Sequence, residues 1–316
     1  MNKKNFILIG VLLLLVVSLL ISRSCENVEK RFKIFSFNEN EIARITMKDQ
    51  NNQIVIYLND SVWMIDEPVQ AYVKETQINR FIDTFLPLTA STNYQSDSID
   101  RQSFYNVDST GVLVTILDKN NKQLSKVYIG RSQNNPQISY LRNDKSNKIY
   151  QVDNVHSIVN PALNMWREDK IMNITENMIS KIMFGKKNES YELFQSDMGW
   201  SLNLNEMSAP LGYDNSDLNR LLQSVVNLRT STFFDDVFEE YSEKLEKIEL
   251  EILIEPYMGE KIHLKIAKND ENSYVLQKNE EYTTLFRLTN SQFNQLNVDA
   301  EKLVPAGDNL NYDDLI

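Results

Sequence analysis

The chain has 316 residues, of which 42% are hydrophobic and 24% charged, so it is long enough for two globular domains and is not a disordered polymer. Outside the first 23 residues it carries 30 basic and 44 acidic side chains, an excess of negative charge that argues against binding nucleic acid through its phosphates. The single cysteine, Cys25, excludes an intrachain disulfide.

Residues 1–22 predict a membrane anchor or an export signal. Lys3 and Lys4 precede 16 uncharged and almost wholly apolar residues at 6–21. A helix of this length reaches ~24 Å, and flanking Lys and Arg side chains can make up the difference from a hydrocarbon core of ~30 Å. Three outcomes stay open: an uncleaved single-pass anchor, a lipoprotein attached through Cys25 in the sequence Ser-Arg-Ser-Cys, and cleavage followed by secretion. Each places the body outside the cytoplasm, because basic residues hold the N-terminus inside.

Residues 23–38 predict a polar stalk between the membrane and the body. Lys30, Arg31 and Lys33 stand close to the membrane and could touch anionic head groups. A solvated linker is the simpler interpretation, and we adopt it here.

Residues 39–172 predict a first module of short antiparallel strands around one amphipathic helix. The helix is expected over 75–86, with Thr76 as its N-cap, and a second short helix is expected from about Val155. Alternating apolar residues predict strands at 42–48, 54–58, around Trp63, and at 112–117, 125–130, 138–142 and 148–152.

Residues 173–316 predict a second module in the same order. Its main helix is expected over 217–228 with Ser216 as N-cap, an additional short helix within 235–247, and a loose acidic tail after Pro305. Strands are expected at 179–184, 191–194, around Trp200, and at 248–254, 261–266, 274–277 and 284–288.

A repeat relates the two modules. Trp63 and Trp200 are 137 positions apart, and five apolar positions of each helix match at a distance of 140. Tyr140 with Tyr274, and Tyr150 with Phe286, match at 134 and 136. The predicted fold is α+β: an N-terminal transmembrane or signal helix, then two tandem similar modules of antiparallel sheet with a packed amphipathic helix, the second an internal duplicate. The paired helix positions are Ile78, Phe81, Ile82, Phe85 and Leu86 with Leu218, Leu221, Leu222, Val225 and Val226.

Reactive residues are few and scattered. His156 is expected on a helix surface and His263 in a strand, and neither forms a recognisable site with Cys25. We expect no catalytic, cofactor or metal site. The three Trp residues, 63, 166 and 200, are interpreted as core residues rather than stacking surfaces. Acidic groups that lack the spacing of a calcium loop are interpreted as solvated, namely Asp97 and Asp100, Asp235 and Asp236 with Glu239 and Glu240, and Asp313 and Asp314.

Several short motifs resemble the bacterial domain-of-unknown-function family 4340. They are Trp63 to Pro68, Phe104 to Asp108, Val127 to Gly130, Tyr140 to Arg142, Ile149 to Val152 and Trp166 to Lys170. The likeness is strong over residues 40–172 and weaker afterwards, where the Ile-Gly and Tyr-Asn-Val elements are missing. Where the family usually has Gly after the Tyr, this chain has Asn106, which also tolerates positive φ. The resemblance implies a membrane-anchored protein that accompanies ABC-type transport or gliding-associated membrane components.

These observations together predict a membrane-anchored extracytoplasmic interaction or scaffold protein, accessory to a membrane transport or envelope complex, and not an enzyme. Its expected place is the bacterial cell membrane, as a single-pass protein or lipid-anchored through Cys25. Expected partners are the membrane and protein subunits of a membrane complex, without nucleic acid. The alternatives are a periplasmic ligand-binding protein, which a pocket would favour, and a hydrolase, which converging carboxylates would favour.

Overall fold

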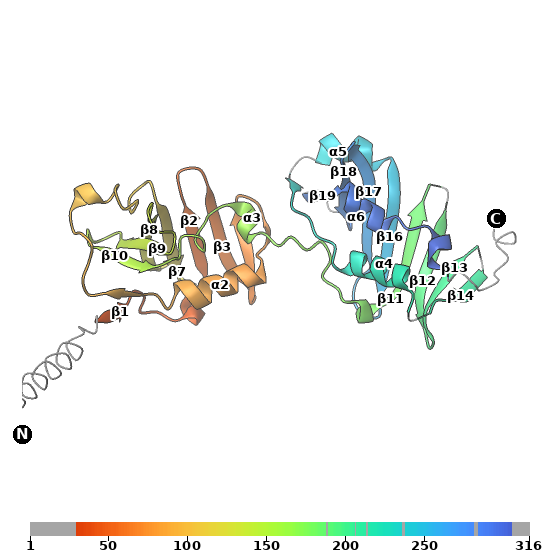
Figure 1. The fold of residues 1–316 in the computed structure, drawn as a ribbon, viewed down its shortest axis with the longest axis horizontal. Helices are drawn as coiled ribbons and strands as arrows, with labels where there is room; N and C mark the ends of the chain where they lie inside the picture. Colours follow the sequence, from red (N-terminus) through yellow and green to blue (C-terminus); the bar gives the residue numbers. More distant parts are fainter. Residues whose placement is uncertain are drawn as a thin grey trace, which may run out of the picture. The chain divides into compact units, whose positions relative to one another are not determined.

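The computed structural model describes residues 30–304, apart from 188, 206, 213, 236–237 and 281–283. It confirms a mixed α+β fold of mostly antiparallel strands with few helices (Figure 1). The predicted anchor and Cys25 lie outside the described residues. Within the described part of the chain, no helix combines the length and apolar character that crossing a bilayer requires. Two compact units divide between Arg167 and Glu168. The sequence prediction put this division at 172/173, but Ile171 and Met172 pack in the second core.

Unit one contains an eight-stranded antiparallel sheet of order β10-β9-β8-β7-β2-β3-β4-β5. Its strands are β2 (Arg44–Lys48), β3 (Gln53–Asn59), β4 (Val62–Glu67), β5 (Ala71–Tyr72), β7 (Val112–Leu117), β8 (Gln123–Arg131), β9 (Ile138–Asn143) and β10 (Ile149–Asp153). The helix α2 (Glu75–Phe85) and the short α3 (Leu163–Trp166) share one core with this sheet, while η1 (Glu39–Glu41) and η2 (Ile99–Arg101) are single 3-10 turns. The rings of Phe81 and Trp166, both fully buried, meet edge to face at 6.0 Å.

The predicted stalk is wrong from Arg31 onward. Residues Arg31–Lys33 form strand β1, which pairs with β6 (Thr89–Ser91) in a separate two-stranded sheet. Phe35 is buried, and its ring lies 5.1 Å from that of Phe85. The segment therefore belongs to unit one. Its basic residues led to the prediction of a linker, although the apolar side chains that follow them pack against the body.

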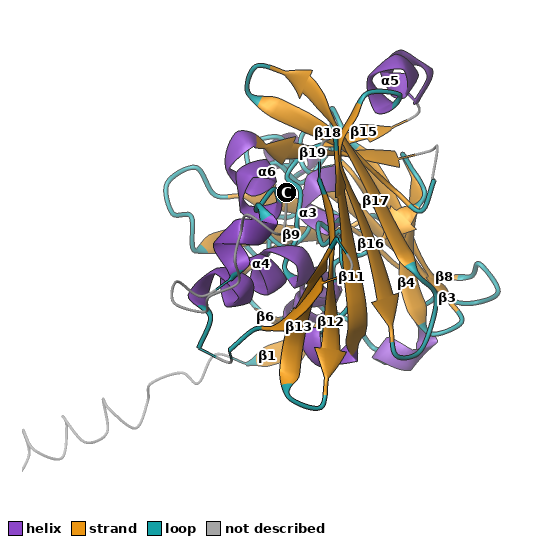
Figure 2. Cartoon of the chain, turned by 90° about the vertical axis from the view of Figure 1, so that its right-hand side faces the viewer, coloured by secondary structure: helices purple, strands orange, loops and turns teal. Residues whose placement is uncertain are grey.

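Unit two contains a nine-stranded antiparallel sheet of order β14-β13-β12-β11-β16-β17-β18-β19-β15. Its strands are β11 (Ile179–Lys186), β12 (Ser190–Ser196), β13 (Gly199–Leu204), β14 (Met207–Pro210), β15 (Phe233–Asp235), β16 (Ile248–Pro256), β17 (Ile262–Asp270), β18 (Ser273–Lys278) and β19 (Thr284–Thr289). Its helices are α4 (Ser216–Val226), α5 (Phe238–Leu245) and α6 (Asn290–Leu296), with 3-10 turns η3 (Glu176–Met178) and η4 (Ala300–Leu303). Figure 2 shows α4 and α6 on one side of this sheet and α5 on the other.

The two sheets share one strand order, with β15 as the addition in unit two. Their hydrogen-bond register also agrees: the pair Leu58 and Trp63 has its counterpart in Gln195 and Trp200, 137 residues later at both positions. The matched helix positions pack against the core in both units, with Leu86 directly after the end of α2 and the others within α2 and α4.

At the far end of the sheets the match between Tyr150 and Phe286 is confirmed, because each pairs with the equivalent leucine of the neighbouring strand. The match between Tyr140 and Tyr274 is wrong by one residue. Register gives Val275 as the counterpart of Tyr140, and Tyr274 turns instead to the core, where its ring stacks 3.7 Å from Phe293.

Three local predictions also need correction. Thr76 and Ser216 lie inside the first turns, and the residues before the helices are Lys74 and Asn215. The Asn215 side chain accepts a hydrogen bond from the Leu218 amide at 2.9 Å, as an N-cap should. The helix expected from Val155 is a turn, and the short helix begins at Leu163.

Candidate functional site

Strands β11, β12 and β16 of unit two present an open outer face. Side chains alternate along each strand, so Ile182 and Phe184 of β11 enter the core with α4 whereas Met183 and Gly185 face the other way. On this outer side α5 covers another part of the sheet, since the small cluster around Leu245 involves residues of β17, β18 and β19.

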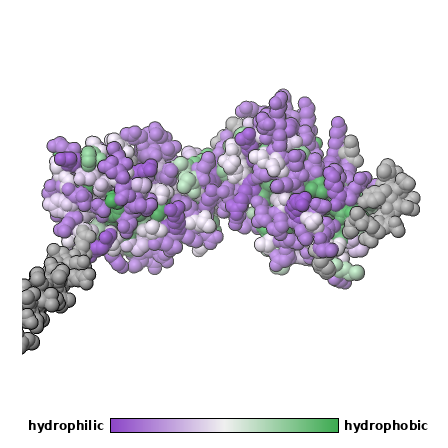
Figure 3. Space-filling model, viewed as in Figure 1, coloured by the Kyte–Doolittle hydropathy of each residue, from purple (hydrophilic) through white to green (hydrophobic). Residues whose placement is uncertain are grey.

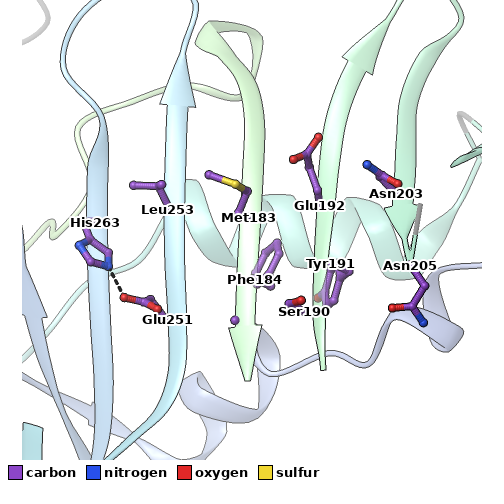
Figure 4. A pocket seen from close by; sticks show the side chains of 11 residues that line it. Met183, Phe184, Ser190, Tyr191, Glu192, Asn203, Asn205, Glu251, Leu253 and His263 are labelled. Carbon is purple, nitrogen blue, oxygen red and sulfur yellow. Dashed lines mark hydrogen bonds and ion pairs between the residues drawn. The ribbon is translucent and has the colours of Figure 1, made fainter. Parts of the chain in front are cut away.

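A hollow of about 500 Å³ lies on this open face. Five of its lining residues form a row across five adjacent strands, each paired with the next across the sheet. In order they are Asn203, Glu192, Met183, Leu253 and His263. Figure 4 shows these side chains spread along adjacent strands, with the His263 ring directed at Glu251. The other lining residues are Phe184, Gly185, Ser190, Tyr191, Asn205 and Glu251.

The hollow exists because its floor carries very small residues. Gly185 pairs with Ser190 on one side and with Glu251 on the other. A Cβ on Gly185 would make ordinary contacts of 3.6 Å with Glu251, so a longer side chain there would fit the sheet and grow into the hollow. The equivalent cross-strand pair in unit one is Lys48 and Gln53, two long side chains.

A second recess of about 450 Å³ adjoins the hollow and shares Glu192 and Asn203 with it. It extends towards the edge strand β14 through Lys181, Phe194 and Ser208. We call the hollow and this recess together the open strip. The strip mixes apolar, amide and charged side chains, a composition suited to contact with a protein surface or a polar ligand.

Ion pairs place charge along the open strip. The imidazole Nε2 of His263 lies 2.6 Å from Glu251 Oε1, and Lys181 Nζ lies 3.2 Å from Glu192 Oε1. Next to Lys181, on the neighbouring strand β16, the hydrogen bond from Lys261 lowers the pKa of Glu255 below its usual value. Exposed pairs of this kind contribute little to stability but fix the direction of the carboxylates.

The buried Tyr191 anchors the sheet beneath the hollow. Its hydroxyl donates to the carbonyl of Val298 at 2.7 Å, and burial raises its pKa far above the usual range. Lys186 bonds the same carbonyl at 2.8 Å and Asp299 at 2.9 Å. Hydrogen bonds from Lys302 and then from Lys186 lower the pKa of Asp299. This network ties the chain after α6 to β11 and β12 beneath the strip.

The histidines lie in different surroundings from each other. His156 sits in a turn after β10, not on a helix surface; its amide donates to Ser139 Oγ at 3.2 Å, and burial, then nearby Arg131, lowers the pKa of its ring. His263 is in strand β17 as predicted, but the sequence reasoning missed its partner Glu251. Alternation along each strand places both residues on the outer face, but only the register of β16 and β17 brings the two side chains together.

The acidic candidates do not converge in the part of the chain that the structure covers. Asp97 and Asp100 are exposed, and Asp97 accepts a hydrogen bond from the Tyr94 hydroxyl at 3.1 Å. Across the described residues no group of three or more His, Cys, Asp or Glu side chains could hold a metal ion. Cys25, Asp236, Asp313 and Asp314 lie outside the described residues, while Asp235 is half-buried in β15 and Glu239 and Glu240 are exposed on α5. Trp166 and Trp200 are buried and Trp63 is half-buried against the first core, as core residues should be.

The Tyr-Asn-Val and Ile-Gly motifs of unit one form a single contact. Asn106 adopts φ +52°, so the turn survives without Gly. A Cβ on Gly130 would lie 1.9 Å from the Tyr105 carbonyl oxygen, which means that the backbone of this loop rests directly on β8. Buried Arg142 fixes the loop by donating from Nε to the Val107 carbonyl at 2.8 Å. These motifs therefore hold a loop on the sheet.

The equivalent of Gly130 in unit two is Ala267, which packs against Leu245 of α5. The Leu245 side chain leaves room for the Cβ of Ala267, whereas the Tyr105 backbone leaves none at Gly130. This explains why the Ile-Gly motif is absent from unit two.

Comparison with known proteins gives one match. The family model described as a domain of unknown function (DUF4340) matches residues 63–248. Neither the curated proteins nor the solved structures contain a match to this chain.

Proposed function

The chain belongs to the DUF4340 family, a domain of unknown function, and from its own residues we propose that it is a membrane-anchored extracytoplasmic interaction or scaffold protein and not an enzyme. Its partner would be a protein subunit of a membrane transport or envelope complex. The observation that carries the proposal is the open strip on unit two, where a sheet face is hollowed instead of filled. The uncharged run at 6–21 after Lys3 and Lys4 supports the anchor.

The chemistry of the strip favours a partner with basic side chains. Glu192 and Glu251 line the hollow, and residues 24–316 carry 30 basic against 44 acidic side chains. Met183 lies between Glu192 and Leu253 in the cross-strand row, and Glu251 is two residues from Leu253 along β16. An apolar stem ending in a cation would therefore contact Met183 and Leu253 with its stem and a carboxylate with its cation. Association through such contacts weakens as salt rises.

Photocrosslinking in intact membranes tests the proposal. A photoreactive amino acid replaces Met183, and the matched control places it at Thr46, the equivalent register position of unit one. We expect one defined membrane protein to be recovered from position 183 and not from position 46.

The same crosslink is then repeated in a chain carrying Gly185→Lys and Ser190→Gln. These are the residues that unit one has at the equivalent positions, so the sheet accepts them while the hollow is filled. Loss of the crosslink with unchanged thermal unfolding supports the open strip as the interface. Equal crosslinking from positions 183 and 46, or survival of the crosslink in the filled variant, refutes it.

A periplasmic ligand-binding protein remains the second candidate, because a hollow of about 500 Å³ has the size of a small-molecule site. Native mass spectrometry of the purified chain distinguishes the two. A bound mass below ~1 kDa that the filled variant loses would favour ligand binding over protein contact.

A further inference from the structure

We propose that one end of unit one docks on an anionic lipid surface. This end, called here the N-proximal surface, consists of residues 30–33, 94–104 and 145–148. It carries β1 and lies beside β10, at one end of the first sheet in Figure 1. The inference rests on the anchor in the proposed function and adds a second, surface contact to it.

The N-proximal surface concentrates exposed apolar side chains. Eight large hydrophobic residues are exposed in the described part of unit one, and four belong to these short segments. Ile99 and Phe104 are 67% and 64% exposed, and Phe32 and Tyr94 are 38% and 42% exposed. On the side seen in Figure 3 both units are mainly hydrophilic. Aromatic and aliphatic side chains of this kind enter the head-group region of a bilayer.

Side-chain contacts join the three segments into one continuous surface. The Phe32 ring meets Tyr150 of β10 at 5.3 Å, next to Lys148. Lys148 Nζ lies 5.0 Å from the centre of the Tyr94 ring. Gln102 Nε2 donates to Asn147 Oδ1 at 3.0 Å. The loop with Ile99 and Phe104 is thereby joined to β1 through residues 147–150.

The charge of the N-proximal surface is opposite to that of the whole body. Its three segments contain six basic and two acidic side chains, in a body that is strongly acidic. Two of the cations lie over aromatic rings of the surface, Lys148 over Tyr94 and Arg101 over Phe104 at 5.7 Å. Cations beside interfacial aromatics favour anionic head groups, whereas the rest of the body would be repelled by them.

The covalent chain brings this surface close to the membrane. Arg31 in β1 is nine positions beyond position 22, the end of the predicted anchor, and nine extended residue steps span at most ~30 Å. The surface therefore stands within about one bilayer thickness of the lipid even before it docks. A tethered surface of matching charge needs only weak contacts to remain bound.

Fluorescence quenching on vesicles tests the docking. The full-length chain, with a fluorescent amino acid at Phe104, is reconstituted into vesicles of phosphatidylcholine alone or with phosphatidylglycerol, each containing a head-group quencher. The matched control carries the fluorophore at Tyr72, which is equally exposed at 64% but sits on the edge strand β5. We expect at least twofold quenching at position 104 in the anionic vesicles, less in the neutral ones, and little at position 72.

The double charge reversal Arg101→Glu with Lys148→Glu should abolish the difference between the two lipid compositions. Equal quenching at positions 104 and 72, or none at 104, while the chain still floats with the vesicles overturns the docking and leaves the anchor intact. A chain that does not float with the vesicles overturns the anchor in the proposed function and the tethered docking with it.

Discussion

Gly130→Ala should separate the loop of unit one from its sheet. The added methyl carbon would lie 1.9 Å from the Tyr105 carbonyl oxygen and 2.7 Å from that of Asn106, against ordinary contacts of 3.4 Å or more. The loop must then move by about 1.5 Å, which takes the Val107 carbonyl away from buried Arg142. Overpacking costs ~1–3 kcal/mol and a buried donor without its acceptor ~1–3 kcal/mol, so we expect about 3 kcal/mol in total.

Scanning calorimetry of the purified chain measures this effect. At roughly 3 °C per kcal/mol for a unit of this size, the unfolding transition of unit one should fall by about 10 °C. Ala267→Gly is the matched control, since Ala267 occupies the equivalent place in unit two and packs against a helix. It should cost only about 1 kcal/mol and lower the other transition. A Gly130→Ala transition within about 2 °C of the unmodified chain would refute the contact.

Three further changes have distinct expected results. Trp166→Ala removes a fully buried ring and should lower the unfolding free energy of unit one by ~3–5 kcal/mol in urea titrations. Asn215→Ala removes the N-cap of α4 and should cost unit two about 1 kcal/mol in the same titrations. Burial alone would raise the pKa of Asp108, but hydrogen bonds from Ser103 and Thr110 outweigh it and lower the pKa. Asp108→Asn should therefore lower the unfolding free energy of unit one at pH 7. In urea titrations repeated at lower pH, the difference in unfolding free energy between the variant and the unmodified chain should vanish below the normal pKa range of Asp.

The inner faces of both units could be predicted because burial imposes a period on the sequence. Ile182 and Phe184 alternate with outer residues, and Ile78 with Phe81 follows the helical period. The short edge strands were missed for the opposite reason. Strand β5 has two residues, too few for a period, and β1 alternates Phe32 with basic residues that read as a linker.

The open strip could not be predicted in the same way. His263 and Glu251 are twelve residues apart, and only the register of β16 and β17 shows that their side chains meet. The hollow forms because Gly185 and Ser190 have no long side chains. The sequence alone does not show on which face of the sheet a glycine in a strand leaves space.

The two units differ most where their side chains do not enter a core. At the positions where unit one has Lys48 and Gln53, unit two has Gly185 and Ser190 in the same register. The outer cover differs as well, since a loop lies on Gly130 in one unit and α5 lies on Ala267 in the other.

Packing constrains the inner faces, because each buried side chain contacts a helix and several strands, and a change of size there costs stability. The outer faces are free of this constraint, so each unit can change there without losing its fold. The shared register is what duplication of one ancestral unit predicts. A hollow formed by two short side chains on this scaffold needs no change in the core. Introducing Lys and Gln at positions 185 and 190 therefore tests the function of unit two without disturbing its fold.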